Sequence, residues 1–391
     1  MYKRIFVVVM DSVGCGTAPL SHLYGDNGAN TIKHISEATG GLNLPTLESL
    51  GLGNLCEIKG IKPTLKGKGF YCKADELSTG KDTMTGHWEM MGIHTTKPFK
   101  TFTDTGFPEE LIHKLEEETG HKIIGNKAAS GTEILKELGE EHLKTNAMIV
   151  YTSADSVLQI ACHEEHFGLN ELYRCCEIAR KICLDDKYKV GRIIARPFVG
   201  ETKDTFKRTP NRHDYALSPS HNTTLDTLKN AGLSVISIGK IYDIFNGQGL
   251  TESNKSVSNH DGMEILKAKI KSDFTGLCFV NLVDFDALYG HRRDPIGYKN
   301  CLEEFDKDLE NVINLMQEND LLIITADHGN DPTWQGTDHT REYVPILIYT
   351  SKLTGKQIKD RASFADIGQT ICENFGLEKQ SIGTSFLGEI K

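Results

Sequence analysis

The amino-acid sequence predicts an α/β fold with a mostly parallel central sheet flanked by helices. Short apolar runs rich in Val and Ile alternate along the chain with longer amphipathic stretches. Short, β-branched runs that are nearly free of charge are typical of buried strands, and strand–helix alternation of this kind builds a largely parallel sheet. Four of these runs also lead into an aspartate, and ligands of open α/β sheets bind outside the carboxyl ends of the strands.

The expected strands and helices follow from these two patterns. The strands are 4–10 ("RIFVVVM"), 147–153, 190–195, 233–239, 277–283, 321–326 and 344–349. The helices, which show apolar residues at helical spacing, include 170–184, 223–232 and 298–316. Gly232 at the end of the second helix suits a C-cap, because glycine readily adopts the left-handed conformation found there.

Length and composition limit the possible functions. A chain of 391 residues exceeds one ordinary domain, so we expect two. The net charge of −10 argues against a nucleic acid or an anionic membrane as the main partner, although an anionic small molecule needs only a local basic patch. No apolar run is long enough to span a bilayer, and Asp11 interrupts the first run too early for a signal peptide. The ten cysteines are scattered without a C-x-x-C pair, which predicts reduced thiols and a cytoplasmic location.

The aspartates that follow the expected strands are the first candidates for a site. They are Asp11, Asp155, the pair Asp284 and Asp286, and Asp327. A single aspartate after a strand is usually a helix cap or a turn former, and Asp155 could be only that. Four such positions together favour a shared site.

Two segments add histidines to these carboxylates. Asp286 stands five residues before His291. Asp327 is followed directly by His328, and His339 stands eleven residues after His328. Mixed carboxylate and imidazole ligands suit Mn²⁺, with Zn²⁺ and Mg²⁺ as alternatives, and the lack of thiols argues against a structural zinc site. Five or six such ligands are enough for two ions about 4 Å apart, a pair that typically stabilises phosphoryl transfer. The alternative is a polar loop rich in turn formers. We assign ordinary structural roles to His163 and His166, which lie in a polar segment near no other ligand candidate, and to Asp331 and Asp338, which turn chemistry explains.

The segment "STGKDTMTGHWEMMG" (78–92) offers hydroxyl groups that such ions could activate. Its hydroxyls belong to Ser78, Thr79, Thr83 and Thr85, in a loop expected to lead into a helix at "HWEMM". Since helix N-termini favour anions, a hydroxyl at this position could carry a phosphoryl group. Ordinary helix capping is the alternative, and two metal ions within reach would favour a threonine nucleophile.

Taken together, the motifs resemble those of a known enzyme family. The segments "MDSVGCG", "STGKDTMTGHWEMMG", "GNKAASGTEI", "YTSADSVLQIA", "ARPFVG", "FKRTPNRHDYAL", "NLVDFDALYGHRRD" and "TADHGNDPTWQGTDHTREYVP" closely resemble those of the bacterial, metal-dependent phosphopentomutases. That family belongs to the alkaline phosphatase superfamily. The resemblance runs nearly from end to end, and it implies an alkaline-phosphatase-like core with an inserted, smaller α/β cap domain.

The resemblance also implies residue roles and an activity. Asp11, Asp327 and His328 would hold one Mn²⁺, and Asp286, His291 and His339 the other, with Mg²⁺, Co²⁺ or Zn²⁺ as substitutes. Thr83 would be the phosphorylated nucleophile that bridges both ions, and Thr85 is the residue most easily confused with it. The implied activity is that of an isomerase, which interconverts α-D-ribose 1-phosphate and D-ribose 5-phosphate, and the 2-deoxyribose pair. Glucose 1,6-bisphosphate or a related sugar bisphosphate would prime the threonine.

The positions of the ligand candidates predict how the chain divides. All of them lie before residue 90 or after residue 280, so we expect a discontinuous metal-binding core of residues 1–100 and 217–391. Residues 101–216 would form the inserted cap domain. The segment 191–213 carries a local excess of basic residues, which suits a substrate phosphate. By resemblance, Arg192, Arg208 and Lys240 would hold the distal phosphate, and Ser153 and Asp155 would contact the sugar hydroxyls.

Three other functions remain open from the sequence. One is another mutase of the superfamily, such as a cofactor-independent phosphoglycerate mutase, which usually has a serine nucleophile and a longer chain. Another is a plain phosphomonoesterase, because a two-metal core does not by itself distinguish hydrolysis from transfer. The last is a non-catalytic protein that binds a metal or a sugar phosphate, and such a protein would have no need of a hydroxyl at position 83.

Overall fold

The computed structural model describes residues 1–153 and 156–390, and the chain forms two compact units. The discontinuous unit comprises Met1–Pro98 and Ser218–Lys391, and the inserted unit comprises Phe99–Leu217. The division expected from the sequence, at 100/101 and 216/217, lies within two residues of these bounds. Each unit has its own sheet and is described separately.

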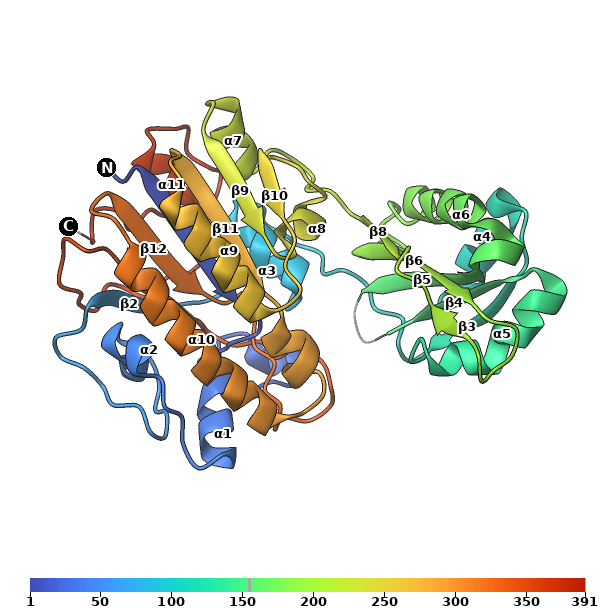
Figure 1. The fold of residues 1–391 in the computed structure, drawn as a ribbon, viewed down its shortest axis with the longest axis horizontal. Coiled ribbons are helices and arrows are strands. Elements are labelled where there is room, and N and C mark those ends of the chain that lie inside the picture. The colour runs from blue at the N-terminus through green and yellow to red at the C-terminus, as the bar shows by residue number, and fades with distance from the viewer. Residues whose placement is uncertain (154–155, 391) are drawn as a thin grey trace. The chain divides into compact units, whose positions relative to one another are not determined.

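A seven-stranded sheet forms the centre of the discontinuous unit (Figure 1). In spatial order its strands are β10 (Glu252–Asn254), β9 (Ser234–Ile238), β11 (Gly276–Leu282), β1 (Arg4–Met10), β12 (Asp320–Thr325), β13 (Val344–Tyr349) and β2 (Gly69–Ala74). The first five strands are parallel to one another. β1 is wholly buried between β11 and β12, as its uninterrupted apolar sequence requires.

The sheet departs from the parallel pattern at one edge. β13 pairs antiparallel with β12, and β2 pairs antiparallel with β13. The segment between β12 and β13 contains no crossover helix, and a connection without one returns the chain in the opposite direction. β2, with the sequence "GFYCKA", was not expected, because a glycine and a lysine weaken its apolar pattern.

Two groups of helices flank this sheet. In the first group, α9 (Asn259–Lys271) and α10 (Pro295–Leu315) pack side by side, and α10 also contacts α1 (Thr31–Ala38) and α2 (Pro45–Ser49) (Figure 1). In the second, α11 (Ala365–Asn374) contacts α7 (Thr224–Asn230) and α3 (Thr83–Met90), and α3 contacts α8 (Ile241–Phe245). Short helical turns cover Ser21–Tyr24, Leu52–Asn54 and Phe285–Gly290. The C-cap of α7 is Ala231, so Gly232, which was expected to be the cap and has φ of 76°, lies one position beyond it.

The inserted unit is a smaller α/β domain. Its mixed sheet has the order β3 (Ile123–Ala128), β4 (Met148–Thr152), β5 (Val157–His163), β6 (Arg192–Val199), β7 (Lys207–Arg208), with β8 (His213–Ala216) also paired to β6. The helices are α4 (Glu109–Thr119), α5 (Glu133–Thr145) and α6 (Leu169–Ile182), and a helical turn covers Glu164–Gly168. Residues of α4 and α6 form one apolar cluster with the sheet, and residues of α5 form a second. The unit therefore has an apolar core of its own.

The structure also bears on the state of the cysteines and on possible membrane-spanning helices. All ten cysteines are free thiols, and nine of them are buried, in line with the expected reduced state. Within the described residues, no helix combines the length and the apolar character that a membrane span requires.

Candidate active site

Three neighbouring parallel strands bring carboxylates together at their carboxyl ends. Asp11 directly follows β1, Asp327 comes two residues after β12, and Asp286 lies in the helical turn after β11. All three side chains are buried. Asp155 lies outside the described residues, and its segment belongs to the inserted unit.

The six residues expected to bind metal form two groups. Asp11, Asp327 and His328 make the first group, in which the ligand atoms lie within 4.8 Å of one another. Nε2 of His328 is 3.5 Å from Oδ1 of Asp11 and 3.4 Å from Oδ2 of Asp327. Residues 11 and 327 are therefore brought together as the sequence predicted.

Asp286, His291 and His339 make the second group, with the same 4.8 Å limit between ligand atoms. The Asp286 carboxylate is 3.2 Å from Nε2 of His291 and 3.4 Å from Nε2 of His339. The imidazole rings of His328 and His339 stack with centroids 3.9 Å apart. Because these two rings belong to different groups, the groups are direct neighbours.

Backbone carbonyls fix the orientation of all three imidazoles. Nδ1 of His328 donates to the Gly329 carbonyl at 3.0 Å, Nδ1 of His291 to the Thr337 carbonyl at 2.8 Å, and Nδ1 of His339 to the Lys81 carbonyl at 3.0 Å. A carbonyl oxygen only accepts, so each Nδ1 carries a hydrogen and each Nε2 faces the carboxylates. Metal-binding histidines are commonly held in this way.

The charges of the first group fit a divalent cation. Among the described residues, none donates a hydrogen bond to Oδ1 of Asp11 or to Oδ2 of Asp327, although two ring nitrogens lie 3.2 and 3.4 Å from the latter. Burial, together with the nearby Asp327 and Asp286, raises the pKa of Asp11 to about 7. Burial alone would lower the pKa of His328, but the surrounding carboxylates outweigh it and raise that pKa to about 9. Buried carboxylates without partners are unfavourable unless a cation neutralises them, and the oxygen and nitrogen ligands suit Mn²⁺.

Helix α3 places one hydroxyl beside these groups. The helix begins at Thr83, earlier than expected, because Asp82 caps it by accepting the backbone N–H of Thr85 at 3.1 Å. The hydroxyl of Thr85 also donates to Asp82, at 2.6 Å, and Thr85 is buried. Oγ1 of Thr83 instead lies 3.2 Å from Nε2 of His328. The structure thus separates a capping threonine from a threonine that faces the ligands.

The other two hydroxyls of this segment have local partners. Oγ of Ser78 accepts the N–H of Thr95 at 3.1 Å, and Oγ1 of Thr79 donates to the Thr95 carbonyl at 3.1 Å. The loop itself is held by Arg341, a fully buried side chain that donates to the carbonyls of Ser78 and Gly80 and to the Glu76 carboxylate. These contacts hold in place the loop that leads into α3.

α3 also packs closely against a ligand-bearing strand end. A Cβ atom at Gly86 would lie 2.3 Å from the backbone oxygen of Asp327, so only glycine permits this approach. On the other side of Asp327, Oδ1 accepts the N–H of Ser12 at 3.0 Å, and Ser12 has an unusual positive φ of 72°. Backbone geometry therefore sets the position of Asp327 from two directions.

Several supporting residues were not found from the sequence. Asn281 donates to Oδ2 of Asp11 at 2.7 Å, and Asn330 donates to Oδ1 of Asp286 at 2.7 Å. Arg293 in turn donates to Oδ1 of Asn330 at 2.6 Å. His87, also missed, lies one turn after Thr83 in α3. A signal was present for Asn281, the one polar side chain in the apolar strand "GLCFVNL".

The residues expected to bind substrate are divided between the units. Ser153, Arg192 and Arg208 belong to the inserted unit, and Lys240 belongs to the discontinuous unit, as the residue before α8. Arg192 is 3.6 Å from the Asp214 carboxylate, and Arg208 donates to the Tyr151 hydroxyl at 3.3 Å.

The four polar residues that were assigned structural roles have local partners. His163 accepts backbone N–H groups of Glu165 and His166, so it caps the turn that contains His166. Asp331 accepts the N–H and the hydroxyl of Thr333, and Asp338 pairs with Lys81 at 3.0 Å.

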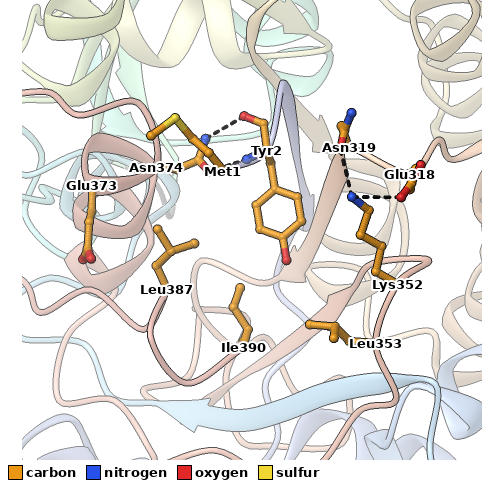
Figure 2. A pocket seen from close by; sticks show the side chains of 10 residues that line it. All are labelled: Met1, Tyr2, Glu318, Asn319, Lys352, Leu353, Glu373, Asn374, Leu387 and Ile390. Atoms are coloured by element: carbon orange, nitrogen blue, oxygen red, sulfur yellow. Dashed lines mark hydrogen bonds and ion pairs between the residues drawn. The ribbon is translucent and has the colours of Figure 1, made fainter.

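A pocket of about 290 Å³ lies at the other end of the strands, where β1 and β12 begin (Figure 2). Its lining includes Tyr2, Asn319 and Lys352, which flank the start of β1, the start of β12 and the end of β13. Figure 2 shows the Lys352 ammonium bound to Asn319 and Glu318, each at 3.1 Å. The candidate metal ligands follow the other ends of β1 and β12, so this pocket is separate from them.

Comparison with known proteins identifies the family. A family model described as the metalloenzyme superfamily matches residues 3–379. The chain is 59% identical over 394 aligned residues to the phosphopentomutase of Clostridium tetani, covering 100% of this chain and 99% of the relative. The chain belongs to the phosphopentomutase family. A phosphomutase is an isomerase, so this family member is an enzyme of that class, and the non-catalytic alternative is excluded. Its superfamily implies a divalent metal.

Solved structures confirm the expected fold of this phosphopentomutase family member. A protein from Pyrococcus horikoshii superposes with a TM-score of 0.50 at 12% identity, covering 98% of this chain and 100% of that one. Phosphoglycerate mutase of Leishmania mexicana also superposes with a TM-score of 0.50, at 13% identity, covering 98% and 97%. Identities this low show the fold alone. Together with the superfamily match they confirm the alkaline-phosphatase-like α/β fold.

Proposed function

We propose that this enzyme interconverts α-D-ribose 1-phosphate and D-ribose 5-phosphate, and the 2-deoxyribose pair, through a phosphothreonine at Thr83. The name and the high identity of the Clostridium tetani relative support a pentose phosphate substrate. The observation that carries the mechanism is the position of the Thr83 hydroxyl, 3.2 Å from His328 at the N-terminus of α3. The N–H groups and dipole at a helix N-terminus favour a phosphoryl group there.

The two ligand groups are our proposed sites for two Mn²⁺ ions. Asp11, Asp327 and His328 would hold one ion, and Asp286, His291 and His339 would hold the other, with the Thr83 hydroxyl beside His328 of the first group. The buried carboxylates and the Nε2 atoms turned toward them support this assignment. Bound there, divalent ions would favour the alkoxide form of Thr83 and balance the charge of the transferred phosphoryl group. Mg²⁺, Co²⁺ or Zn²⁺ could take the same positions.

The proposed reaction has two phosphoryl transfers, each with one bond formed and one broken. In the first, the O–P bond of phosphorylated Thr83 breaks while a sugar-phosphate hydroxyl forms its own O–P bond and loses its proton. The product is a sugar bisphosphate. In the second, Thr83 forms an O–P bond with the phosphorus at the other end of the sugar, and the released sugar oxygen takes a proton. Glucose 1,6-bisphosphate or a related bisphosphate supplies the first phosphoryl group.

The inserted unit is proposed as a cap that helps to exclude water. Arg192, Arg208 and Lys240 hold the phosphate that is not reacting, and Ser153 and Asp155 contact the sugar hydroxyls. A local basic excess at 191–213, in a chain of net charge −10, supports the phosphate contacts. A cytoplasmic location is part of the same proposal.

A product assay tests the proposed function. Ribose 5-phosphate is supplied with Mn²⁺ and glucose 1,6-bisphosphate, and ribose 1-phosphate and inorganic phosphate are both measured. We expect ribose 1-phosphate to be the main product, and omission of the bisphosphate to slow its formation. Inorganic phosphate as the main product would indicate a phosphomonoesterase. Turnover of 3-phosphoglycerate without turnover of the pentose would indicate the other mutase.

A further inference from the structure

His87 is a buried histidine that adjoins the first ligand group (Asp11, Asp327 and His328) without belonging to either group. Its side chain is fully buried on α3, one helical turn after Thr83. The imidazole lies against the ring of Phe279 in β11, with centroids 5.7 Å apart. It therefore fills the space between the helix that carries the hydroxyl and the strand next to β1.

The hydrogen bonds of His87 have a defined direction. Nδ1 donates to the Thr83 carbonyl at 2.8 Å, so Nδ1 carries the hydrogen and Nε2 accepts. The group next to Nε2, at 3.3 Å, is the amide nitrogen of Asn281, which can only donate. The second hydrogen of that amide goes to Oδ2 of Asp11 at 2.7 Å. One chain of hydrogen bonds thus connects the Asp11 carboxylate to the first turn of α3.

The same imidazole also lies beside the other carboxylate of the first ligand group. Nδ1 of His87 is 3.2 Å from Oδ2 of Asp327, both groups being fully buried. The Asn281 amide occupies Oδ2 of Asp11, which leaves Oδ1 of Asp11 as the oxygen nearest His328, at 3.5 Å. His87 therefore holds the Thr83 backbone directly and the Asp11 carboxylate through Asn281, and its imidazole lies against the Asp327 carboxylate.

We propose that His87 is a positioning residue that couples the Thr83 turn of α3 to the ion site formed by Asp11, Asp327 and His328. The inference rests on the proposed function, because that proposal makes Thr83 and these ligands the reacting centre. Carboxylate ligands are commonly held by a second layer of hydrogen bonds, and loss of such a partner typically weakens metal affinity by about 10- to 100-fold. His87 lies against Asp327 and reaches Asp11 through Asn281, both in the first ligand group, so we expect the effect to fall on that ion.

The test measures metal binding apart from turnover. Metal-free His87→Phe is titrated with Mn²⁺ by calorimetry, beside His87→Asn, which keeps a donor near the position of Nδ1. We expect His87→Phe to bind one of two Mn²⁺ ions about 10- to 100-fold more weakly than the unaltered protein. His87→Asn should recover part of that affinity. Asn281→Leu, which breaks the same chain at its other link, should weaken the same ion.

His142→Phe is the matched control. His142 is equally buried and also has a partner at each ring nitrogen, the Ala147 carbonyl at 2.6 Å and the His163 N–H at 2.8 Å, but it lies in the inserted unit. We expect this variant to bind both ions as the unaltered protein does. His87→Phe is then assayed for phosphorylation by glucose 1,6-bisphosphate at saturating Mn²⁺. We expect a reduced kcat with little change in KM, because the alignment of Thr83 with the ligands is lost while substrate binding is kept.

The inference is overturned if His87→Phe binds both ions normally and is phosphorylated at the normal rate. It is also overturned if both ions are weakened equally and the metal-free variant melts at a much lower temperature, which would indicate a purely structural role. Should His87→Phe not fold, Asn281→Leu and His87→Asn decide the question in the same titration. The titration needs no substrate. Weakening of one ion in a protein that turns over no pentose phosphate would therefore support the role of His87 and refute the proposed substrate.

Discussion

The hydroxyl of Thr83 lies 3.2 Å from Nε2 of His328, although 245 residues separate the two along the chain. The closeness depends on a helix and a strand end that touch, since Gly86 of α3 meets the backbone of Asp327 with no room for a side chain.

Incubation with glucose 1,6-bisphosphate should add one phosphoryl group, and peptide mapping should place it on Thr83. Thr83→Ala should fold and bind Mn²⁺ but take up no phosphoryl group, because no acceptor oxygen remains. Thr85→Ser is the control, since it keeps the hydroxyl that donates to Asp82. A label on Thr85 in the unaltered protein would show that the roles of the two threonines are reversed.

Removal of metal should abolish activity. We expect EDTA to stop turnover and Mn²⁺ to restore it. His339→Ala should reduce the bound Mn²⁺ to about one ion per chain, because a lost ligand weakens its own site first. Elemental analysis after gel filtration measures this, with His166→Ala of the inserted unit as the control. Two ions retained by His339→Ala would refute the assignment of this histidine.

Arg293 should control the second ion. Its guanidinium donates to Oδ1 of Asn330, which holds Asp286, and to the carbonyls of Gly336 and Asp338, close to Thr337 and His339. Arg293→Ala should therefore weaken Mn²⁺ binding at the Asp286 site by about 10-fold or more, while the other ion is bound normally.

The control for Arg293 is its exposed neighbour. Arg292→Ala removes the same charge from an exposed position, so it separates the hydrogen bonds from the charge itself. Equal Mn²⁺ titrations for the two variants would show that the guanidinium of Arg293 does not position the ligands.

The basic residues proposed to hold the distal phosphate should distinguish transfer from hydrolysis. Arg192→Ala or Lys240→Ala should lower kcat/KM for the mutase reaction by about 100-fold, as expected when a charge-assisted contact to the distal phosphate is lost. Hydrolysis of a small aryl phosphate, which has no second phosphate, should change far less. Lys203→Ala, in the same basic segment but exposed, is the control. Parallel loss of both activities would mean that these residues act on the metal core.

Much of the fold was predictable because it depends on local sequence. The strands expected at 4–10 and 344–349 have those bounds in the structure, and the five other expected strands are present with shifts at their ends. Those shifts are largest for β6, which runs on to Val199 through Arg196 and Pro197, residues that end an apolar pattern without ending the strand. The antiparallel direction of β13 depends on the connection from β12, which has no crossover helix. The composition of the strand itself does not reveal this direction.

The candidate site likewise has some residues that the sequence revealed and others that it did not. Aspartates and histidines at strand ends were visible in the sequence, and the structure brings the six of them into two adjoining groups. The start of α3 was missed because the helix was expected from His87 onward, whereas the Asp82 side chain caps it four residues earlier. Asn281, His87 and Arg293 were missed because their roles come from contacts across the fold, between residues such as Asn281 and Asp11 that are 270 positions apart.

The central position of β1 has a consequence for how the protein is made. Among the described strands, β1 pairs with β11 and β12, and residues 11–275 must be translated before the first of these partners begins. At about 5–20 residues per second, this apolar strand waits roughly 13–53 s on the ribosome with both of its edges open. The inserted unit, whose sheet and core lie within Phe99–Leu217, can fold during that interval. We therefore expect ribosome-bound chains to expose β1 to chaperones, and the reacting centre to assemble only late in synthesis.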